Sequence, residues 1–288
     1  MSRTTATLIG FTAILMWSAL AVLTVATTPV PPFLLNALTF AIGGGLGLVW
    51  AAARGQIGAL RRVPLRVYAM GTAAMFGYHA LYFSALRLAP PAQASLICFL
   101  WPLLIVLGSG LMPGERLRAG HVIGAIIAFA GAAAILGGGG ALQSGAMLGY
   151  GLAFCCALIW AAYSLGSRRG AHVPTAAVAV FCLATALLSA LIHPLVEVTA
   201  WPRDPLGWGA VAALGAGPVG LAFFTWDIGV KRGDIQVLGT ASYAAPVLST
   251  LILIATGASQ AGAGVIAAAA MIATGALLAA RAGRSRPE

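Results

Sequence analysis

Charged side chains are scarce in this sequence. Only 8% of its 288 residues are charged and only six are acidic, whereas 60% are hydrophobic. A soluble domain carries about a quarter charged residues, because its surface must face water. The composition therefore excludes an ordinary water-soluble domain and indicates a chain that lies mostly within a lipid bilayer.

Motifs for covalent chemistry are also missing. Lys231 is the only lysine, and no glycine-rich phosphate-binding sequence precedes it. Neither HExxH nor GxSxG occurs. The four cysteines lie within apolar runs, without the spacing of a zinc site or a disulfide framework. We therefore expect no enzyme activity, no metal, no cofactor and no ATP-driven pumping.

Long apolar runs fill the sequence instead. Each is about 20 residues long, the length of helix that crosses the hydrocarbon core. No alternation of period two suggests an outer-membrane barrel. The runs predict an all-α integral membrane protein of ten transmembrane helices with no separate soluble domain. The expected helices lie near 7–26, 33–53, 65–88, 92–112, 118–138, 145–166, 174–193, 206–229, 235–256 and 260–280.

Basic residues indicate the orientation. If the N-terminus is cytoplasmic, all sixteen Lys and Arg residues except Arg87 and Arg203 fall on the cytoplasmic side. Such a bias fixes the orientation of membrane proteins, so we expect both termini in the cytoplasm. The basic residues behind the net charge of +10 are then explained by the orientation of the chain in the membrane, and they do not indicate nucleic-acid binding. Asp227 and Lys231, four residues apart, predict an ion pair on one helix face.

The sequence contains an internal repeat. GFTAILMWSALA (10–21) resembles GLAFCCALIWAAY (151–163), and Pro102 aligns with Pro246 further on. We expect a first five-helix repeat at 1–140 and a second at 141–288, together forming one transmembrane domain. An odd number of helices places the two repeats in opposite directions. Inverted repeats are typical of transporters whose substrate site lies near the midplane.

Three polar aromatic residues lie together in the third expected helix. Tyr78, His79 and Tyr82 have the spacing of one helix side. The imidazole could simply be bonded to a neighbouring hydroxyl or carbonyl. It could instead belong to a water-accessible cavity, because ionisable residues within membrane spans usually mark functional sites.

Aromatic residues and prolines recur at mid-helix positions of both halves. Tryptophan normally prefers the membrane interface, and each proline removes a backbone hydrogen bond. Interrupted helices in matching positions point to a transporter site, although core packing is the alternative for each aromatic residue taken singly. We predict a cavity with aromatic walls (Trp17, Tyr78, Tyr82, Trp101, Trp160, Tyr163, Tyr243), polar groups (His79, Asn36, Ser95, Ser242) and prolines that permit bending (Pro102, Pro246).

A family resemblance rests on these tryptophans and on the segment ALRLAPPAQASLICFLWPLLIVLGSGLMPGERL (85–117). The chain resembles the drug/metabolite transporter superfamily, in its ten-helix branch with two EamA-like halves. The family pattern has a proline within the fourth helix and a glutamate just beyond it, here Pro102 and Glu115. The second half has Ser259 in place of the glutamate, so we interpret Glu115 as a structural residue at a helix-end turn.

Within this superfamily the chain is similar to the YddG-type exporters of aromatic amino acids. The resemblance implies a multi-pass secondary transporter that exports aromatic or apolar amino acids across the bacterial inner membrane by alternating access. Its expected partners are this small-molecule substrate and the lipid bilayer. Proton exchange through His79 is one option for coupling, and facilitated diffusion is the other. Exporters of other metabolites or drugs, and a membrane enzyme or scaffold, are the alternative functions.

Overall fold

The computed structural model describes residues 1–136, 144–255 and 263–284. All regular structure in these ranges is helical, and no strand occurs among them, so the predicted all-α class is confirmed. Five described helical segments are long and apolar enough to cross a membrane, and three shorter apolar helices accompany them. The five are 3–26, 32–53, 147–169, 177–196 and 205–232.

The first half contains long helices joined by short connections. Prolines begin several of them, which fits their fixed φ and missing N–H. In chain order the helices are α1 (Arg3–Ser18), α2 (Leu20–Ala26), α3 (Pro32–Ala53), α4 (Ile57–Leu60), α5 (Leu65–Leu88), α6 (Pro91–Cys98), α7 (Trp101–Ser109) and α8 (Ala119–Leu136).

The second half is built in the same way. Asp204 and Asp234 accept hydrogen bonds from the first N–H groups of α11 and α13 and so begin these helices. The elements are η1 (Ser144–Ala146), α9 (Met147–Arg169), α10 (Ala177–Val196), α11 (Pro205–Ala216), the π-turn η2 (Gly217–Leu221), α12 (Ala222–Arg232), α13 (Ile235–Ala241), α14 (Ala244–Ala255) and α15 (Ala263–Arg284).

Two expected helices are interrupted at matching places. α6 ends at Cys98 and α7 starts at Trp101, with Pro102 in its first turn. α13 ends at Ala241 and α14 starts at Ala244, two residues before Pro246. Whether these prolines bend their helices during transport stays a prediction. The sequence did not suggest the π-turn η2, which interrupts a further long segment at Pro218.

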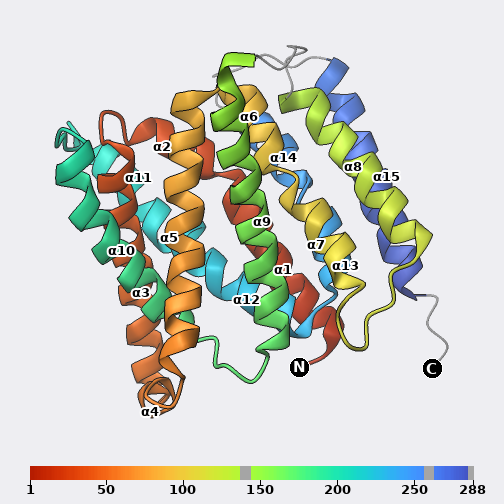
Figure 1. Cartoon of the computed structure of the whole chain (residues 1–288), viewed down its shortest axis with the longest axis horizontal. Coiled ribbons are helices and arrows are strands. Elements are labelled where there is room, and N and C mark those ends of the chain that lie inside the picture. Colours follow the sequence, from red (N-terminus) through yellow and green to blue (C-terminus); the bar gives the residue numbers. More distant parts are fainter. Residues whose placement is uncertain (137–143, 256–262, 285–288) are drawn as a thin grey trace.

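Four helices of the first half each pack against a helix of the second half. α3 packs on α10, α8 on α15, α1 on α12 and α5 on α9. A Cβ atom on Gly124 would lie 2.4 Å from the Gly275 carbonyl oxygen, so the backbones of α8 and α15 touch at this point. Figure 1 shows the start of α1 and the end of α15 at the same end of the bundle, with α4 also at that end. We call this the terminal end.

Candidate functional site

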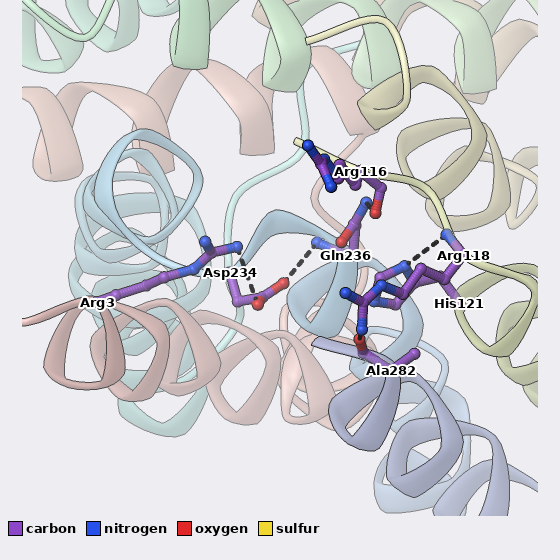
Figure 2. A pocket seen from close by; sticks show the side chains of 7 residues that line it. All are labelled: Arg3, Arg116, Arg118, His121, Asp234, Gln236 and Ala282. Carbon is purple, nitrogen blue, oxygen red and sulfur yellow. Dashed lines mark hydrogen bonds and ion pairs between the residues drawn. The ribbon is translucent and has the colours of Figure 1, made fainter. Parts of the chain in front are cut away.

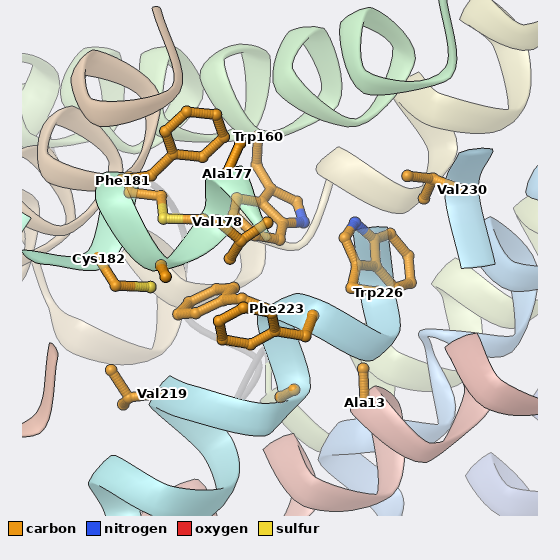
Figure 3. Packing of buried hydrophobic residues seen from close by; sticks show 14 of the residues in the cluster. Ala13, Trp160, Ala177, Val178, Phe181, Cys182, Val219, Phe223, Trp226 and Val230 are labelled. Atoms are coloured by element: carbon orange, nitrogen blue, oxygen red, sulfur yellow. The ribbon is translucent and has the colours of Figure 1, made fainter. Parts of the chain in front are cut away.

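Five aromatic side chains from four helices meet inside the bundle. They are Trp17 of α1, Trp101 of α7, Trp160 of α9, and Phe223 and Trp226 of α12, and we call them the central aromatic cluster. The ring centroids of Trp17 and Trp226 are 5.2 Å apart, and those of Trp101 and Trp226 are 5.6 Å apart. Figure 3 shows Trp160, Phe223 and Trp226 facing one another. Both halves of the chain therefore supply this cluster.

The indole N–H groups of the cluster fall into two classes. Trp17 donates to the Pro218 carbonyl oxygen at 3.0 Å, and Trp226 donates to the Ser164 hydroxyl at 3.1 Å. Among the described residues, Trp101 and Trp160 donate to no protein group. Two donors are thus available to a molecule bound beside the rings.

Tyr78, His79 and Tyr82 of α5 lie next to the cluster. The sequence predicted that these three residues share one side of their helix. The tyrosine rings are stacked at 6.2 Å with an interplanar angle of 8°, and Tyr78 lies 5.5 Å from Trp160. His79 meets the Phe40 ring edge-on at 5.0 Å. All three side chains are half-buried although apolar rings surround them.

His79 presents one nitrogen atom to any ligand. Its Nδ1 lies 2.7 Å from the Met75 carbonyl oxygen. A carbonyl oxygen only accepts, so Nδ1 carries the hydrogen, and the neutral ring has its lone pair on Nε2. Nε2 has no hydrogen-bond partner among the described residues. From the sequence, the imidazole could be bonded to a neighbouring group or belong to a cavity. The structure shows the bonded arrangement for Nδ1 only.

Two further residues from the predicted cavity lie beside this group. The Tyr163 ring is 5.3 Å from Trp160 and 6.5 Å from Phe181 of α10. Ser95 of α6 is half-buried, and its hydroxyl lies beside that of Tyr82. Seven of the eleven predicted wall and polar residues thus form one connected ring group, with Ser95 at its edge: Trp17, Tyr78, His79, Tyr82, Trp101, Trp160 and Tyr163.

Three predicted residues make their contacts elsewhere. The Tyr243 hydroxyl, in a separate cluster with Phe129, accepts a hydrogen bond from the backbone N–H of Leu103 at 3.0 Å. The Ser242 hydroxyl donates to the carbonyl oxygen four residues earlier at 2.8 Å. Asn36 is buried and donates to the Ser189 hydroxyl across the α3–α10 contact at 3.0 Å. Asn36 and Tyr243 thus join helices, and Ser242 bonds within its own helix.

Sequence reasoning missed Phe40, Phe223 and Trp226. Phe40 stacks on Phe223 at 5.5 Å, and Trp226 is completely buried. A signal for Trp226 existed, because the alignment of repeats places it opposite Phe83 of α5. Phe40 and Phe223 are aromatic residues in apolar helices, and nothing in the sequence distinguishes them from ordinary core residues.

A buried ion network lies at the terminal end. Glu115, in the α7–α8 connection, contacts Arg168 at the end of α9 and lies 3.3 Å from Arg3 of α1. Arg3 also lies 3.0 Å from Asp234, just before α13. The Glu115 side chain is only 2% exposed. The sequence predicted a structural role for Glu115 at a helix-end turn. The structure adds that its carboxylate joins segments that are far apart in the sequence.

Little space remains beside this network. Figure 2 shows the pocket between Arg3, Asp234, Gln236 and the two arginines that precede α8, Arg116 and Arg118. Its volume is about 10 Å³, and a single water needs about 10–15 Å³. This pocket is therefore too small to hold an amino acid.

A second carboxylate holds the opposite end together. Glu197, just after α10, accepts hydrogen bonds from the backbone N–H groups of Phe33 (3.0 Å) and Leu34 (3.3 Å) at the start of α3. It also lies 2.9 Å from His193 Nδ1 and 3.5 Å from Arg87 at the end of α5. Glu197 therefore joins α3, α5 and α10 without contacting the helices of the terminal-end network.

The predicted Asp227–Lys231 ion pair is confirmed. The ammonium and carboxylate groups are 2.8 Å apart, and both side chains are at most 5% exposed. The Thr175 hydroxyl donates to the same carboxylate at 2.7 Å. This carboxylate therefore joins α12 to the segment just before α10.

Comparison with known proteins gives consistent matches. The EamA-like transporter family matches residues 4–137 and again 147–281. The aromatic amino acid exporter YddG of Ancylobacter novellus is 55% identical over 282 residues, covering 97% of this chain and 98% of the relative. The exporter of the same name from Salmonella typhimurium is 28% identical over 88% of each chain. A solved structure described as "Crystal structure of protein" is 54% identical, with a TM-score of 0.94 over 98% of this chain and 100% of that one.

Proposed function

The chain belongs to the EamA-like transporter family and is a multi-pass transporter of the bacterial inner membrane, and from this premise we propose that it exports aromatic and other apolar amino acids. The observation that carries this proposal is the central aromatic cluster with its unused hydrogen-bonding groups. The relatives named as aromatic amino acid exporters support the same cargo.

The chemistry of the cluster matches both ends of such a cargo. Aromatic rings prefer stacked or edge-to-face contacts at centroid distances of about 4.5–7 Å, which the existing rings already adopt among themselves. The indole N–H groups of Trp101 and Trp160 would donate to the substrate carboxylate. The lone pair on His79 Nε2 would accept from the ammonium group. We place Trp17, Tyr78, Tyr82 and Tyr163 around the side chain of the substrate.

We further propose ten membrane crossings arranged as two inverted five-helix repeats. Counting the interrupted helices as single crossings, the second crossing packs on the seventh and the fifth on the tenth. The first packs on the eighth, and the third packs on the sixth. Exchanging the two halves leaves this set of pairs unchanged, which supports an internal twofold axis. The basic residues then assign the terminal end to the cytoplasm.

The two carboxylates suggest how alternating access would work. In this scheme the Glu115 network would hold the proposed cytoplasmic end closed. Opening that end requires Arg3 and Arg168 to leave Glu115. Glu197 would restrain the outer ends of α3, α5 and α10 in the opposite step. Substrate would enter from the cytoplasm after the first network opens and leave on the other side.

Flux of labelled phenylalanine or tryptophan through the purified protein in proteoliposomes tests the proposal. We expect transport down a concentration gradient without ATP. The variants His79→Ala and Trp101→Ala should reduce it at least tenfold, as expected for loss of about 1.4 kcal/mol or more. Trp208→Ala is the matched control, because Trp208 is half-exposed and stacks only on Trp201. Wild-type flux in both site variants would refute this site.

The same assay decides the coupling and the alternative cargoes. A rate that follows an imposed pH gradient would indicate proton exchange, and a rate that ignores it would indicate facilitated diffusion. Competition by unlabelled drugs or polar metabolites, without competition by aromatic amino acids, would favour the alternative that the chain exports another class of compound.

A further inference from the structure

A groove runs along the outside of the bundle between α5 and α10. Its two walls are rows of residues spaced by four, Leu65, Ala69 and Ala73 on α5 and Val180, Ala184 and Leu188 on α10. Small residues at the middle of each row leave a volume of about 500 Å³. Leu65, Ala69, Ala73 and Leu188 are exposed, so the groove opens to the surface that faces lipid.

The inner side of the groove is sealed by aromatic packing. The rings of Tyr68 and Phe181 lie 6.0 Å apart, edge to face. A Cβ atom on Gly71 would lie 2.6 Å from the Phe181 ring, so α5 and α10 are in direct contact there. The Tyr68 hydroxyl donates to the Leu60 carbonyl oxygen at 2.8 Å. This bond uses the Tyr68 hydroxyl, and Thr72 supplies the one other hydroxyl of an otherwise apolar lining.

The groove has the length of one lipid leaflet. Each wall extends over nine residues, or about 12 Å at 1.5 Å per residue. Half of a hydrocarbon core is about 15 Å thick. Because the row on α5 starts at the first residue of that helix, the groove begins at the terminal end of the bundle.

Three arginines without a counter-ion lie near the terminal end of the groove, which we call its mouth. Arg61, Arg62 and Arg66 are exposed, and their guanidinium groups make no hydrogen bond or ion pair with any residue that the structure describes. The five described acidic residues are already bonded to other groups: Glu115, Glu197, Asp204, Asp227 and Asp234. Basic pockets at the ends of transmembrane helices attract anionic headgroups.

We propose that this groove binds an anionic phospholipid. One acyl chain lies between α5 and α10, and Arg61, Arg62 and Arg66 hold the headgroup phosphate. Arg66 follows Leu65 of the wall in the chain, and the Tyr68 hydroxyl of the groove bonds to the Leu60 carbonyl oxygen, next to Arg61, so these arginines lie near the terminal end of the groove. A neutral lipid would fill the apolar groove but would not neutralise the arginines. A free phosphate would neutralise the arginines but leave the groove empty.

Native mass spectrometry of the purified full chain tests this site. The delipidated protein is titrated with phosphatidylglycerol or with phosphatidylcholine of the same acyl chains, and bound lipids are counted. We expect the first phosphatidylglycerol to bind the wild type about tenfold more tightly than the first phosphatidylcholine, a conservative expectation for three arginines near a membrane surface. Equal binding of the two lipids would overturn the proposal.

Matched variants separate the headgroup from the chain. R61Q/R62Q/R66Q should lose the preference for phosphatidylglycerol, whereas R116Q/R169Q/R232Q, which removes three exposed arginines elsewhere at this end, should keep it. A73F/A184F should weaken the first binding of both lipids by filling the groove. A190F, at an exposed position of α10 outside the groove, should not. Thermal unfolding confirms that each variant is folded.

Three results would contradict the assignment. The preference could survive in R61Q/R62Q/R66Q, or it could fall equally in the control triple variant, which would indicate a general surface potential. Lipid binding could also survive in A73F/A184F. A dimeric wild type that becomes monomeric in A73F/A184F would instead identify the groove as an interface between two copies of the chain.

Discussion

Replacing Glu115 by glutamine should open the terminal end of the protein. The substitution keeps the shape of a side chain that is 2% exposed but removes its charge from Arg3 and Arg168. Breaking a fully buried ion pair costs about 3–5 kcal/mol. The arginine side chains are 34% and 18% exposed, so solvent screening reduces the effect. We therefore expect a loss of about 2 kcal/mol for the closed conformation, or about a 30-fold change in the ratio of closed to open molecules.

Hydrogen–deuterium exchange in lipid nanodiscs measures this change. Peptides from the start of α1 and from the α12–α13 connection should exchange faster in Glu115→Gln than in the wild type. Glu197→Gln is the matched control, because that side chain is also 2% exposed and also contacts an arginine. It should accelerate exchange at the start of α3 and leave the terminal end unchanged. Unchanged exchange at the terminal end of Glu115→Gln, or the same pattern in both variants, would refute the reasoning.

Three further outcomes follow from individual contacts. His79→Gln keeps an acceptor and should retain more amino acid flux than His79→Leu, and equal flux would argue against a bond to Nε2. Trp101→Phe removes an unused N–H and should lower flux without changing the melting temperature, whereas Trp226→Phe loses a bond to Ser164 and should lower the melting temperature. Gly124→Ala should destabilise the fold by several kcal/mol through its clash with α15. Gly151→Ala, in α9 with nothing within 4 Å of the added Cβ, should stabilise it by up to about 1 kcal/mol, both by thermal unfolding.

The apolar runs were enough to predict the helical class, because a helix that crosses a bilayer must be long, apolar and internally hydrogen-bonded. The helix interruptions before Pro102 and Pro246 were also marked locally, since proline cannot continue the hydrogen-bond ladder. The π-turn at Pro218 was not recognised. The Trp17 N–H bonds to the Pro218 carbonyl in this turn, and this partner is 201 residues away in the sequence.

The sequence indicated the surroundings of some candidate site residues but not of others. Tyr78, His79 and Tyr82 were recognisable because polar groups are rare in apolar helices. Tyr243 has the same local pattern but packs against Phe129 and caps the start of α7 through Leu103. Only the packing of helices distinguishes these cases. Glu115 shows the same limit, since the sequence marks a helix end but not the arginines that meet there.

The central claim is that the aromatic cluster binds amino acids during export. Counterflow in proteoliposomes tests it most directly: vesicles containing wild-type protein are loaded with unlabelled phenylalanine and then exposed to a trace of labelled tryptophan. We predict that internal phenylalanine accelerates uptake of the label, that internal aspartate does not, and that Trp101→Phe abolishes most of the acceleration. Acceleration by aspartate equal to that by phenylalanine, or none by any amino acid, would contradict the account.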